Sequence, residues 1–370
     1  MTFSFDALRR WPDIEGPDQL AVDAADRLIL DESAAARADL PRTDIAVIGD
    51  GYGAMALGAA DAGTDGVVRV HQDSLLGERA LAANAERTGL TDAVASVPLS
   101  PELLRGARVV LLRLPKSLDE LRDIAGAIAA HAAPDVVVFA GGRLKHMSVG
   151  MNAVLGENFS RLDITHARQK SRVLIAQGPR NGRDPEPRRA THDGLVVCGF
   201  GGVFAGTSID IGTRFLLEHL PETIPAEGRV VDLACGSGVV AAWLARRHPE
   251  LSVYASDPSA VAVASARATA AANEAGDRIT VVRDDALSAL PDSSASFIAL
   301  NPPFHSGTAI DTRLAAHLFA DAARALRPGR ELWTVWNSAL RYRGELERIV
   351  GPTRQIARNG KFTVTASVAR

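Results

Sequence analysis

Apolar runs of strand length recur along this chain and alternate with longer, alanine-rich segments of helical periodicity. In the second half the strand-like runs are residues 229–232, 251–256, 278–283, 296–300 and 331–336. Helix-like segments between them include residues 239–247 and 260–273, and a further strand, 362–366, is expected to close the sheet. Strands that alternate with helices are typical of parallel sheets, so the pattern predicts an α/β fold.

The first half repeats this order about 185 residues earlier. Its strand-like runs are residues 43–48, 66–70, 108–112, 136–140 and 171–176, and its helix-like segment 75–87 corresponds to 260–273. We therefore expect two α/β domains, residues 1–178 and 191–370. Each should be a mostly parallel seven-stranded sheet with helices on both faces and an antiparallel strand near the C-terminal edge. Residues 179–190, rich in Pro, Gly and Arg, are expected to form an exposed linker.

A turn of small residues follows Asp232 and leads into the predicted helix 239–247. Small side chains let the backbone N–H groups at a helix N-terminus approach a ligand closely. The turn consists of Ala234, Cys235, Gly236, Ser237 and Gly238. Taken alone, such a loop suits a nicotinamide dinucleotide equally well. Cys235 is expected to be there for its size, not as a nucleophile.

Acidic residues stand where the next two strands end. Asp257, followed by Pro258, can accept hydrogen bonds from both ribose hydroxyls of an adenosine. The third strand ends in Asp284, Asp285 and Ala286, where a carboxylate would meet an adenine amine. The two strand ends together indicate a site for an adenosine-containing cofactor.

The tetrapeptide Asn301-Pro302-Pro303-Phe304 follows the fourth strand. Proline cannot continue a helix and holds the preceding residue in extended geometry, so Asn301 stays at the strand end, where open α/β sheets bind ligands. The Asn301 amide oxygen and the Pro302 carbonyl can accept both N–H bonds of an exocyclic amine. Phe304 offers a flat face on which a base can stack. The tetrapeptide therefore favours methyl transfer to an amine over hydride transfer.

With these motifs the sequence resembles class I S-adenosylmethionine-dependent methyltransferases, and within them the two-domain ribosomal RNA guanine-N2 methyltransferases. The resemblance implies S-adenosyl-L-methionine as cofactor and a guanine of ribosomal RNA, free or in a subunit particle, as substrate. The large-subunit type (23S) is favoured over the small-subunit type (16S). It also implies that Phe204 and Asp210 lie near the methionine end of the cofactor and the substrate. His305 directly follows the tetrapeptide and could hydrogen-bond the target's ribose or phosphate; the alternative is that it only faces solvent. Ala234 stands where the family often has Gly; alanine costs little where φ is negative.

The corresponding tetrapeptide is lost from the first half. Arg113 occupies the position of the asparagine and Lys116 that of the aromatic residue, so we expect a non-catalytic methyltransferase-like domain. Its glycine loop, residues 49–53, is intact, which leaves residual cofactor binding open, with Asp73 as a ribose acceptor. Two positive charges at a strand end suit a phosphate, so Arg113 and Lys116 are candidate RNA contacts. The alternative is that this half only buttresses the catalytic one.

Composition is that of an ordinary globular protein, with 46% hydrophobic and 23% charged residues. No apolar run is long enough to cross a bilayer, and neither cysteine has metal-ligand spacing. We therefore expect a cytoplasmic protein, a monomer, without a membrane or a metal among its partners. Net charge is only −3, but residues 324–370 contain ten Lys or Arg and three Asp or Glu, a stretch that could contact RNA phosphates.

Two other functions are compatible with parts of this pattern. A protein glutamine amide would fit the same pair of acceptors, although the doubled fold and the basic C-terminal segment count against it. A non-catalytic RNA-binding or ribosome assembly factor could use the same scaffold. That interpretation is disfavoured because the motif residues are intact, namely Asp232, Gly236, Gly238, Asp257 and Asn301.

Overall fold

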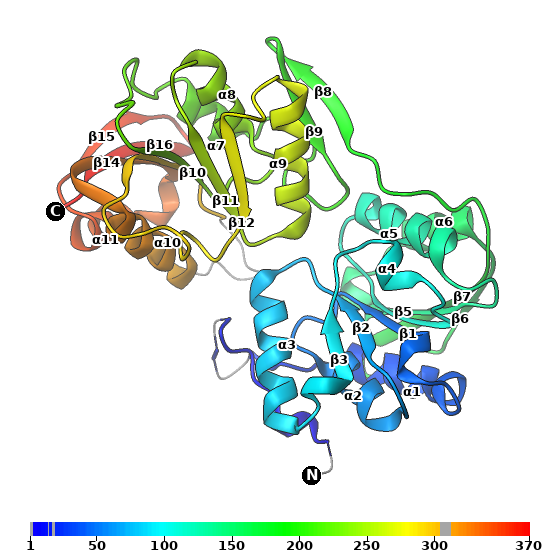
Figure 1. The fold of residues 1–370 in the computed structure, drawn as a ribbon. Coiled ribbons are helices and arrows are strands. Elements are labelled where there is room, and N and C mark those ends of the chain that lie inside the picture. Colours follow the sequence, from blue (N-terminus) through cyan, green and yellow to red (C-terminus); the bar gives the residue numbers. More distant parts are fainter. Residues whose placement is uncertain (1–2, 14, 17–18, 304–311) are drawn as a thin grey trace. The chain divides into compact units, whose positions relative to one another are not determined.

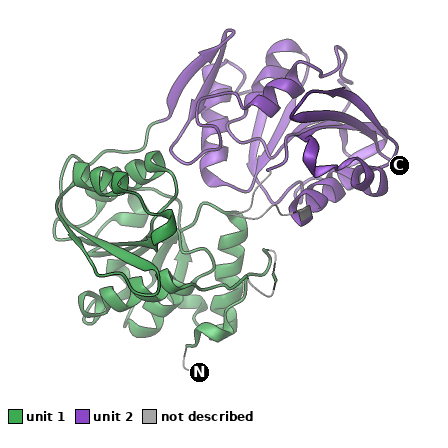
Figure 2. Cartoon of the chain, turned by 180° about the vertical axis from the view of Figure 1, so that it is seen from behind, with its two compact units in different colours: residues 1–186 green, residues 187–370 purple. Residues whose placement is uncertain are grey.

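The computed structural model describes residues 3–13, 15–16, 19–303 and 312–370 (Figure 1). The chain divides into two compact units, residues 1–186 and 187–370 (Figure 2). The segment between the strands that flank this boundary is shorter than the predicted linker, because one strand continues to Pro179 and the next begins at Arg188. In the part of the chain that is described, no helix has the length and apolar character needed to cross a membrane.

The first unit is built on a seven-stranded sheet of order β3-β2-β1-β4-β5-β7-β6 (Figure 1). Strands β1 to β5 pair in parallel with one another, and β7 is antiparallel to both β5 and β6. The strands are β1 Ile45–Ile48, β2 Val68–His71, β3 Val94–Ser96, β4 Val109–Arg113, β5 Val137–Arg143, β6 Phe159–Ile164 and β7 Ser171–Pro179. The α-helices are α1 Ala24–Arg37, α2 Ala54–Ala62, α3 Leu75–Thr88, α4 Pro101–Leu104, α5 Leu118–His131 and α6 Val149–Asn158.

The second unit repeats this topology with the order β12-β11-β10-β13-β14-β16-β15. Again only β16, the second strand from the edge, is antiparallel to its neighbours. The strands are β10 Arg229–Leu233, β11 Val253–Asp257, β12 Ile279–Arg283, β13 Ala295–Leu300, β14 Leu326–Asn337, β15 Thr353–Arg358 and β16 Phe362–Val368. The α-helices are α7 Ile211–Leu217, α8 Val239–Arg247, α9 Ala260–Ala272, α10 Thr312–Ala325 and α11 Arg343–Ile349.

Each sheet carries apolar cores on both faces, which explains why its central strands appear in the sequence as continuous apolar runs. In β13, Phe297 and Ala299 belong to one core, whereas Ile298 and Leu300 belong to the other. Strand β4 of the first unit is divided in the same way. The predicted α/β fold with two mostly parallel, seven-stranded sheets is confirmed. The edge strands β3, β6 and β15 were not among the predicted strand segments.

A two-stranded hairpin, β8 Arg188–His192 and β9 Leu195–Gly199, precedes the second sheet. Asp193 and Gly194 form its turn with φ of 50° and 80°, and positive φ at both positions matches the type I′ turns that suit the twist of a hairpin. The backbone N–H groups of Val196, Cys198 and Phe200 in and after β9 donate to Asn273, Thr269 and Ser265 at or near α9. These acceptors are spaced four residues apart on one helix face. Side chains at or near α9 thus satisfy the N–H groups along one edge of β9, which fixes the hairpin against this helix.

Candidate cofactor and substrate site

In the turn after β10, three alternate residues have left-handed backbone conformations. Ala234, Gly236 and Gly238 have φ of 57°, 53° and 76°. A Cβ on Gly238 would lie 2.9 Å from the Cα of Ala266 in α9, so only glycine fits where α8 begins. The condition on which we expected Ala234 to cost little, a negative φ, is not met. The backbone of Ala234 is held in a left-handed conformation, which costs a residue with a Cβ about 1–2 kcal/mol.

Asp232 lies beneath this turn and is almost fully buried. Its Oδ2 accepts a hydrogen bond of 2.8 Å from the backbone N–H of Ala241, which anchors the first turn of α8. Burial raises the pKa of Asp232 to about 7, despite that hydrogen bond. Asp232 therefore stabilises the loop by fixing the start of the helix that follows it.

Asp257, at the end of β11, faces the loop from the side. Its Oδ2 accepts from the N–H of Gly236 at 3.0 Å, and its Oδ1 accepts from the N–H of Ser259 at 2.9 Å. The carboxylate is thereby fixed at the carboxyl end of the sheet, next to the loop amides. This is the placement that a ribose acceptor requires.

The two acidic residues after β12 have different environments. Asp284 is buried and accepts from the Ser288 hydroxyl at 2.5 Å and the Ala289 N–H at 2.9 Å, so it stabilises its own loop. The Asp285 side chain is 19% exposed and lies 2.9 Å from Nε2 of His317 in α10; this hydrogen bond raises the pKa of His317. Of the pair predicted to meet an adenine amine, Asp285 is the accessible one. Ala286 follows with φ of 53°, and its carbonyl accepts from the Ser256 hydroxyl.

Asn301 emerges from the end of β13 with its side chain oriented by α7. Its Nδ2 donates to Oγ1 of Thr213 at 2.8 Å and approaches Oδ2 of Asp210 at 3.4 Å. Asp210 is the N-cap of α7, where it accepts from the N–H of Gly212 at 2.8 Å. Asn301 Oδ1 is buried and has no hydrogen-bond partner among the described residues. An oriented amide with an unused acceptor is therefore present at the strand end.

The structure brings eight of the twenty predicted site residues together around one small cavity of about 50 Å³. Its lining consists of Phe204, Ala205, Ser208, Asp210, Thr213, Asp232, Ala234, Cys235, Gly236, Ser237, Val239, Val240 and Asn301. Ligand pockets usually measure 300–1,000 Å³, so this cavity encloses only one end of a cofactor. The remainder would extend along the open strand ends past Asp257 and Asp285.

Outside this cavity, Pro302 is buried and Pro303 exposed, and the Pro258 carbonyl accepts from Arg283. Phe304 and His305 lie outside the described residues. Sequence reasoning missed Thr213, although it stands three residues after the N-cap Asp210, where a side chain faces the same helix end. Burial raises the pKa of the Cys235 thiol well above its ordinary value, which makes it a poor nucleophile, in line with a residue chosen for size.

The first unit preserves the loop but not the functional side chains. Gly49, Gly51 and Gly53 have φ of 76°, 77° and 96°, matching the three positions of the second unit. The registers of β1 with β2 and β4 place Gln72 at the position of Asp257 and Arg113 at that of Asn301. The residues corresponding to Asp257 and Asn301 of the second unit are therefore both different in the first.

Arg113 is held by α1 as Asn301 is held by α7. Its guanidinium donates to Asp23, the N-cap of α1, at 2.7 and 2.5 Å and to Asp26 at 2.6 Å. Burial works against ionisation of Asp23, yet the hydrogen bond and charge of Arg113 outweigh it and lower its pKa to about 2. Contact of Arg113 with an RNA phosphate would require breaking these ion pairs, so the structure argues against that predicted role. Lys116 is exposed, and its role stays a prediction.

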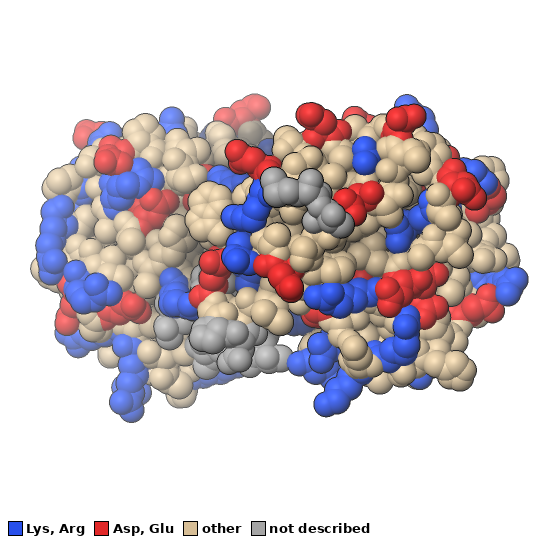
Figure 3. Space-filling view, turned by 90° about the horizontal axis from the view of Figure 1, so that it is seen from below, with Lys and Arg blue, Asp and Glu red and all other residues tan. Residues whose placement is uncertain are grey.

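The basic C-terminal segment is compensated by acidic neighbours only in part. Arg324 pairs with Asp321 at 2.6 Å and with Asp292 at 2.7 Å, and Arg354 pairs with Glu331. Figure 3 shows acidic and basic side chains interspersed on the face that it presents. Contact of this segment with RNA stays a prediction that its net charge alone does not carry.

Together, the doubled sheet, the left-handed loop, the acid after β11 and the Asn-Pro-Pro turn after β13 define a class I S-adenosylmethionine-dependent methyltransferase. The ribosomal RNA large subunit methyltransferase G of Shewanella amazonensis is 33% identical, over 98% of this chain and 95% of its own length. That of Streptomyces avermitilis is 35% identical, over 98% and 97%. The chain belongs to the ribosomal RNA large subunit methyltransferase G family, which confirms the predicted class of enzyme and its large-subunit type.

Family models and a solved structure agree with this assignment. The methyltransferase small domain matches residues 194–366, and the RLMG N-terminal domain matches residues 2–180. The structure of the T. thermophilus 16S rRNA N2 G1207 methyltransferase (RsmC), in complex with AdoMet and guanosine, superimposes with a TM-score of 0.74. It covers 94% of this chain and 92% of that one at 21% identity, so this likeness is one of fold.

The left-handed loop yields a stability prediction. We expect Ala234→Gly to raise the free energy of unfolding by about 0.5–1 kcal/mol, because relief of backbone strain exceeds the entropy that glycine adds to the unfolded chain. Gly236→Ala is the control with the opposite change, because it adds a methyl group at a left-handed position. Its Cβ would meet nothing within 4 Å, so backbone strain alone should lower stability. Urea denaturation of the three proteins measures both changes, and a loss of stability in Ala234→Gly would contradict the strain argument.

Proposed function

We propose that this chain transfers a methyl group from S-adenosylmethionine to the exocyclic N2 amine of a guanine in large-subunit ribosomal RNA, and that the second unit carries out the chemistry. The observation that carries the proposal is the buried Oδ1 of Asn301, which no donor of the described residues satisfies. A buried acceptor left unpaired costs about 1–3 kcal/mol. That cost is recovered when a substrate N–H group enters the site.

An aromatic amine explains why two acceptors are useful. The lone pair of guanine N2 is delocalised into the ring, so the amine is a weak nucleophile. Acceptance of its two N–H bonds by Asn301 Oδ1 and the Pro302 carbonyl would increase electron density on nitrogen. The same oxygens would stabilise the positive charge that develops during transfer, which is electrostatic catalysis by fixed dipoles.

The contacts of Asn301 prepare this arrangement before substrate arrives. Thr213 and Asp210 occupy the Nδ2 side of the amide, so its oxygen is directed away from α7. Rotation of the amide would place its oxygen against the Asp210 carboxylate, which cannot donate a hydrogen bond. The bound cofactor supplies an electrophilic methyl group, and the residues here need only align the amine with it. No strong base is required, since the methylated amine can lose its proton afterwards.

The cofactor is assigned to the second unit on the placement of three groups. The glycine loop at Gly236 and Gly238 lies at the start of α8 and leaves room for a ligand, Asp257 suits the ribose hydroxyls, and Asp285 suits the adenine amine. In the first unit a neutral Gln72 replaces the ribose acid, and the ion pairs of Arg113 occupy the strand end. We therefore assign neither cofactor binding nor catalysis to residues 1–186.

Replacement of the unsatisfied acceptor tests the proposal. We expect Asn301→Ala to lower kcat about 100- to 1,000-fold, as the loss of one fixed polar group at a developing charge typically does. Cofactor affinity should change little. The measurement is methyl incorporation into large-subunit ribosomal RNA, with the product identified by mass spectrometry of nucleosides. Near-normal turnover in the variant, or a wild-type product other than N2-methylguanosine, would refute the proposed role.

The ribose acid gives a separate prediction. Asp257→Ala should weaken binding of S-adenosylmethionine about tenfold or more, because hydrogen bonds to a charged group contribute about 1.5–3 kcal/mol each. Asp73→Ala, which removes an acid near the corresponding strand end of the first unit, is the matched control and should leave affinity unchanged. Calorimetric titration compares the two variants. Equal effects would place the ribose elsewhere.

A further inference from the structure

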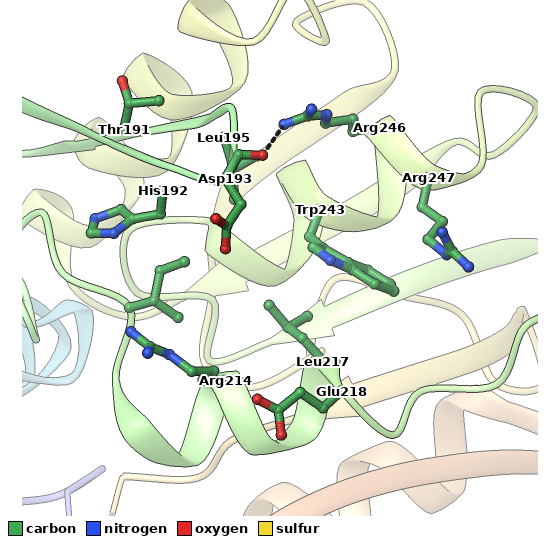
Figure 4. A pocket seen from close by; sticks show the side chains of 11 residues that line it. Thr191, His192, Asp193, Leu195, Arg214, Leu217, Glu218, Trp243, Arg246 and Arg247 are labelled. Carbon is green, nitrogen blue, oxygen red and sulfur yellow. Dashed lines mark hydrogen bonds between the residues drawn. The ribbon is translucent and has the colours of Figure 1, made fainter.

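The second unit contains another cavity, of about 880 Å³, to which the methyl transfer described above assigns no role (Figure 4). It lies between the turn of the β8–β9 hairpin, α7 and α8, and its volume is that of a pocket for a ligand of nucleotide size. The residues that line it are Thr191, His192, Asp193, Leu195, Ile209, Arg214, Leu217, Glu218, Trp243, Arg246 and Arg247.

Three arginines surround this cavity. Arg214 and Arg247 are exposed, and neither side chain has a hydrogen bond or ion pair with any residue that the structure describes. Arg246 donates to the backbone carbonyl of Asp193 at 3.1 Å, so it is anchored at the rim (Figure 4). These side chains differ from Arg324 and Arg354, whose charges are compensated by carboxylates. Unpaired guanidinium groups at a concave site suit a phosphate.

The remaining lining residues suit a base. Trp243 is half-buried and lies between Arg247 and Leu217 in the lining of the cavity (Figure 4). An indole face held in this way is a platform on which an unpaired base stacks. Asp193 and Glu218 also line the cavity; carboxylates repel phosphate but accept hydrogen bonds from the N–H groups of bases. A ligand with both a phosphate and a base satisfies the whole set, whereas a simple anion does not.

The cavity shares a wall with the methyl-transfer site. His192 Nε2 donates to the carbonyl of Thr207 at 2.8 Å, which ties the hairpin to the segment that leads to the N-cap Asp210. In α7, Thr213 holds Asn301 while the next residue, Arg214, lines this cavity. Successive residues of a helix point about 100° apart, so one short helix separates the two sites. A chain that places one nucleotide at Asn301 can place another here.

We propose that this cavity binds a single-stranded nucleotide of the RNA substrate that flanks the target guanine, with its base on Trp243 and its phosphates on Arg214 and Arg247. The proposal rests on the proposed function and extends it. It implies that the RNA must be unpaired both at the target guanine and at the flanking nucleotide. It also assigns recognition of the neighbouring sequence to the unit that performs the chemistry.

The test removes two charges from the cavity. In the intact chain, Arg214→Gln with Arg247→Gln should weaken binding of a fluorescent single-stranded fragment of large-subunit RNA at least about tenfold. The slope of log affinity against log salt should become shallower by about 1–2 units, since each lost phosphate contact on a single strand contributes about 0.7. KM for RNA should rise, while kcat at saturating RNA, cofactor affinity and melting temperature stay unchanged. The matched control, Arg105→Gln with Arg229→Gln, removes the same charge from exposed positions outside both the cavity and the 324–370 segment and should change none of these.

A fluorescence titration gives an independent measure of stacking. Trp333 and Trp336 are buried, and Trp11 is 61% exposed, so a Trp11→Phe background leaves Trp243 as the partly exposed indole. Added single-stranded RNA should quench its emission, and the double arginine variant should require at least about tenfold more RNA for the same quenching. Unchanged emission at saturating RNA would overturn the stacking assignment.

The outcomes separate this proposal from the proposed function. Equal loss of RNA affinity in the cavity variant and its control would show diffuse electrostatics and overturn the proposal. So would unchanged affinity for free RNA with weaker binding of the subunit particle, which would indicate a protein partner. If the wild type forms no N2-methylguanosine, the proposed function fails. A selective effect of the cavity arginines on RNA binding would then still support the nucleotide site.

Discussion

The site depends on a single constraint, the fixed orientation of the Asn301 carboxamide. Its Nδ2 is committed to Thr213 and faces Asp210, so its Oδ1 is left as a buried acceptor at the end of β13. Two features of the fold produce this result. The proline after Asn301 restricts its backbone to extended geometry, and the N-cap of α7 places a carboxylate on the side where the amide nitrogen must be.

The first unit shows the same framework with a different residue at that position. Arg113 replaces Asn301, and the N-terminal turn of α1 holds it through Asp23 and Asp26, as α7 holds the amide through Asp210 and Thr213. Arginine has no acceptor, so it cannot receive an amine N–H group. The acidic residue that anchors the helix after the loop also stands at a different position: Asp232 lies within β10, whereas Asp50 lies after β1. Asp50 accepts from the N–H groups of Met55 and Ala56, and burial raises its pKa to about 6. The duplicated fold is thus retained, while the proposed chemistry is confined to one copy.

Much of this could be predicted from the sequence because the informative signals are local. The glycine loops, the strands that are buried on both faces and the Asn-Pro-Pro turn each lie within a few residues of one another. The β8–β9 hairpin was missed although its Asp193-Gly194 turn is a strong local signal. The ion pairs of Arg113 could not be predicted, because Asp23 lies 90 residues away and only the packing of α1 against β4 brings them together. The same holds for the second cavity, because its arginines come from two helices, Arg214 from α7 and Arg246 and Arg247 from α8.

We propose that the residue at the end of the fourth strand, with the acid after the second, decides which copy of the fold is functional. Calorimetric titration of the intact chain with S-adenosylmethionine measures this most directly. One molecule bound per chain is the predicted result, since only the second unit has Asp257 beside its loop. Two molecules per chain would contradict the account, because the first unit would then bind cofactor despite Gln72 and the ion pairs of Arg113.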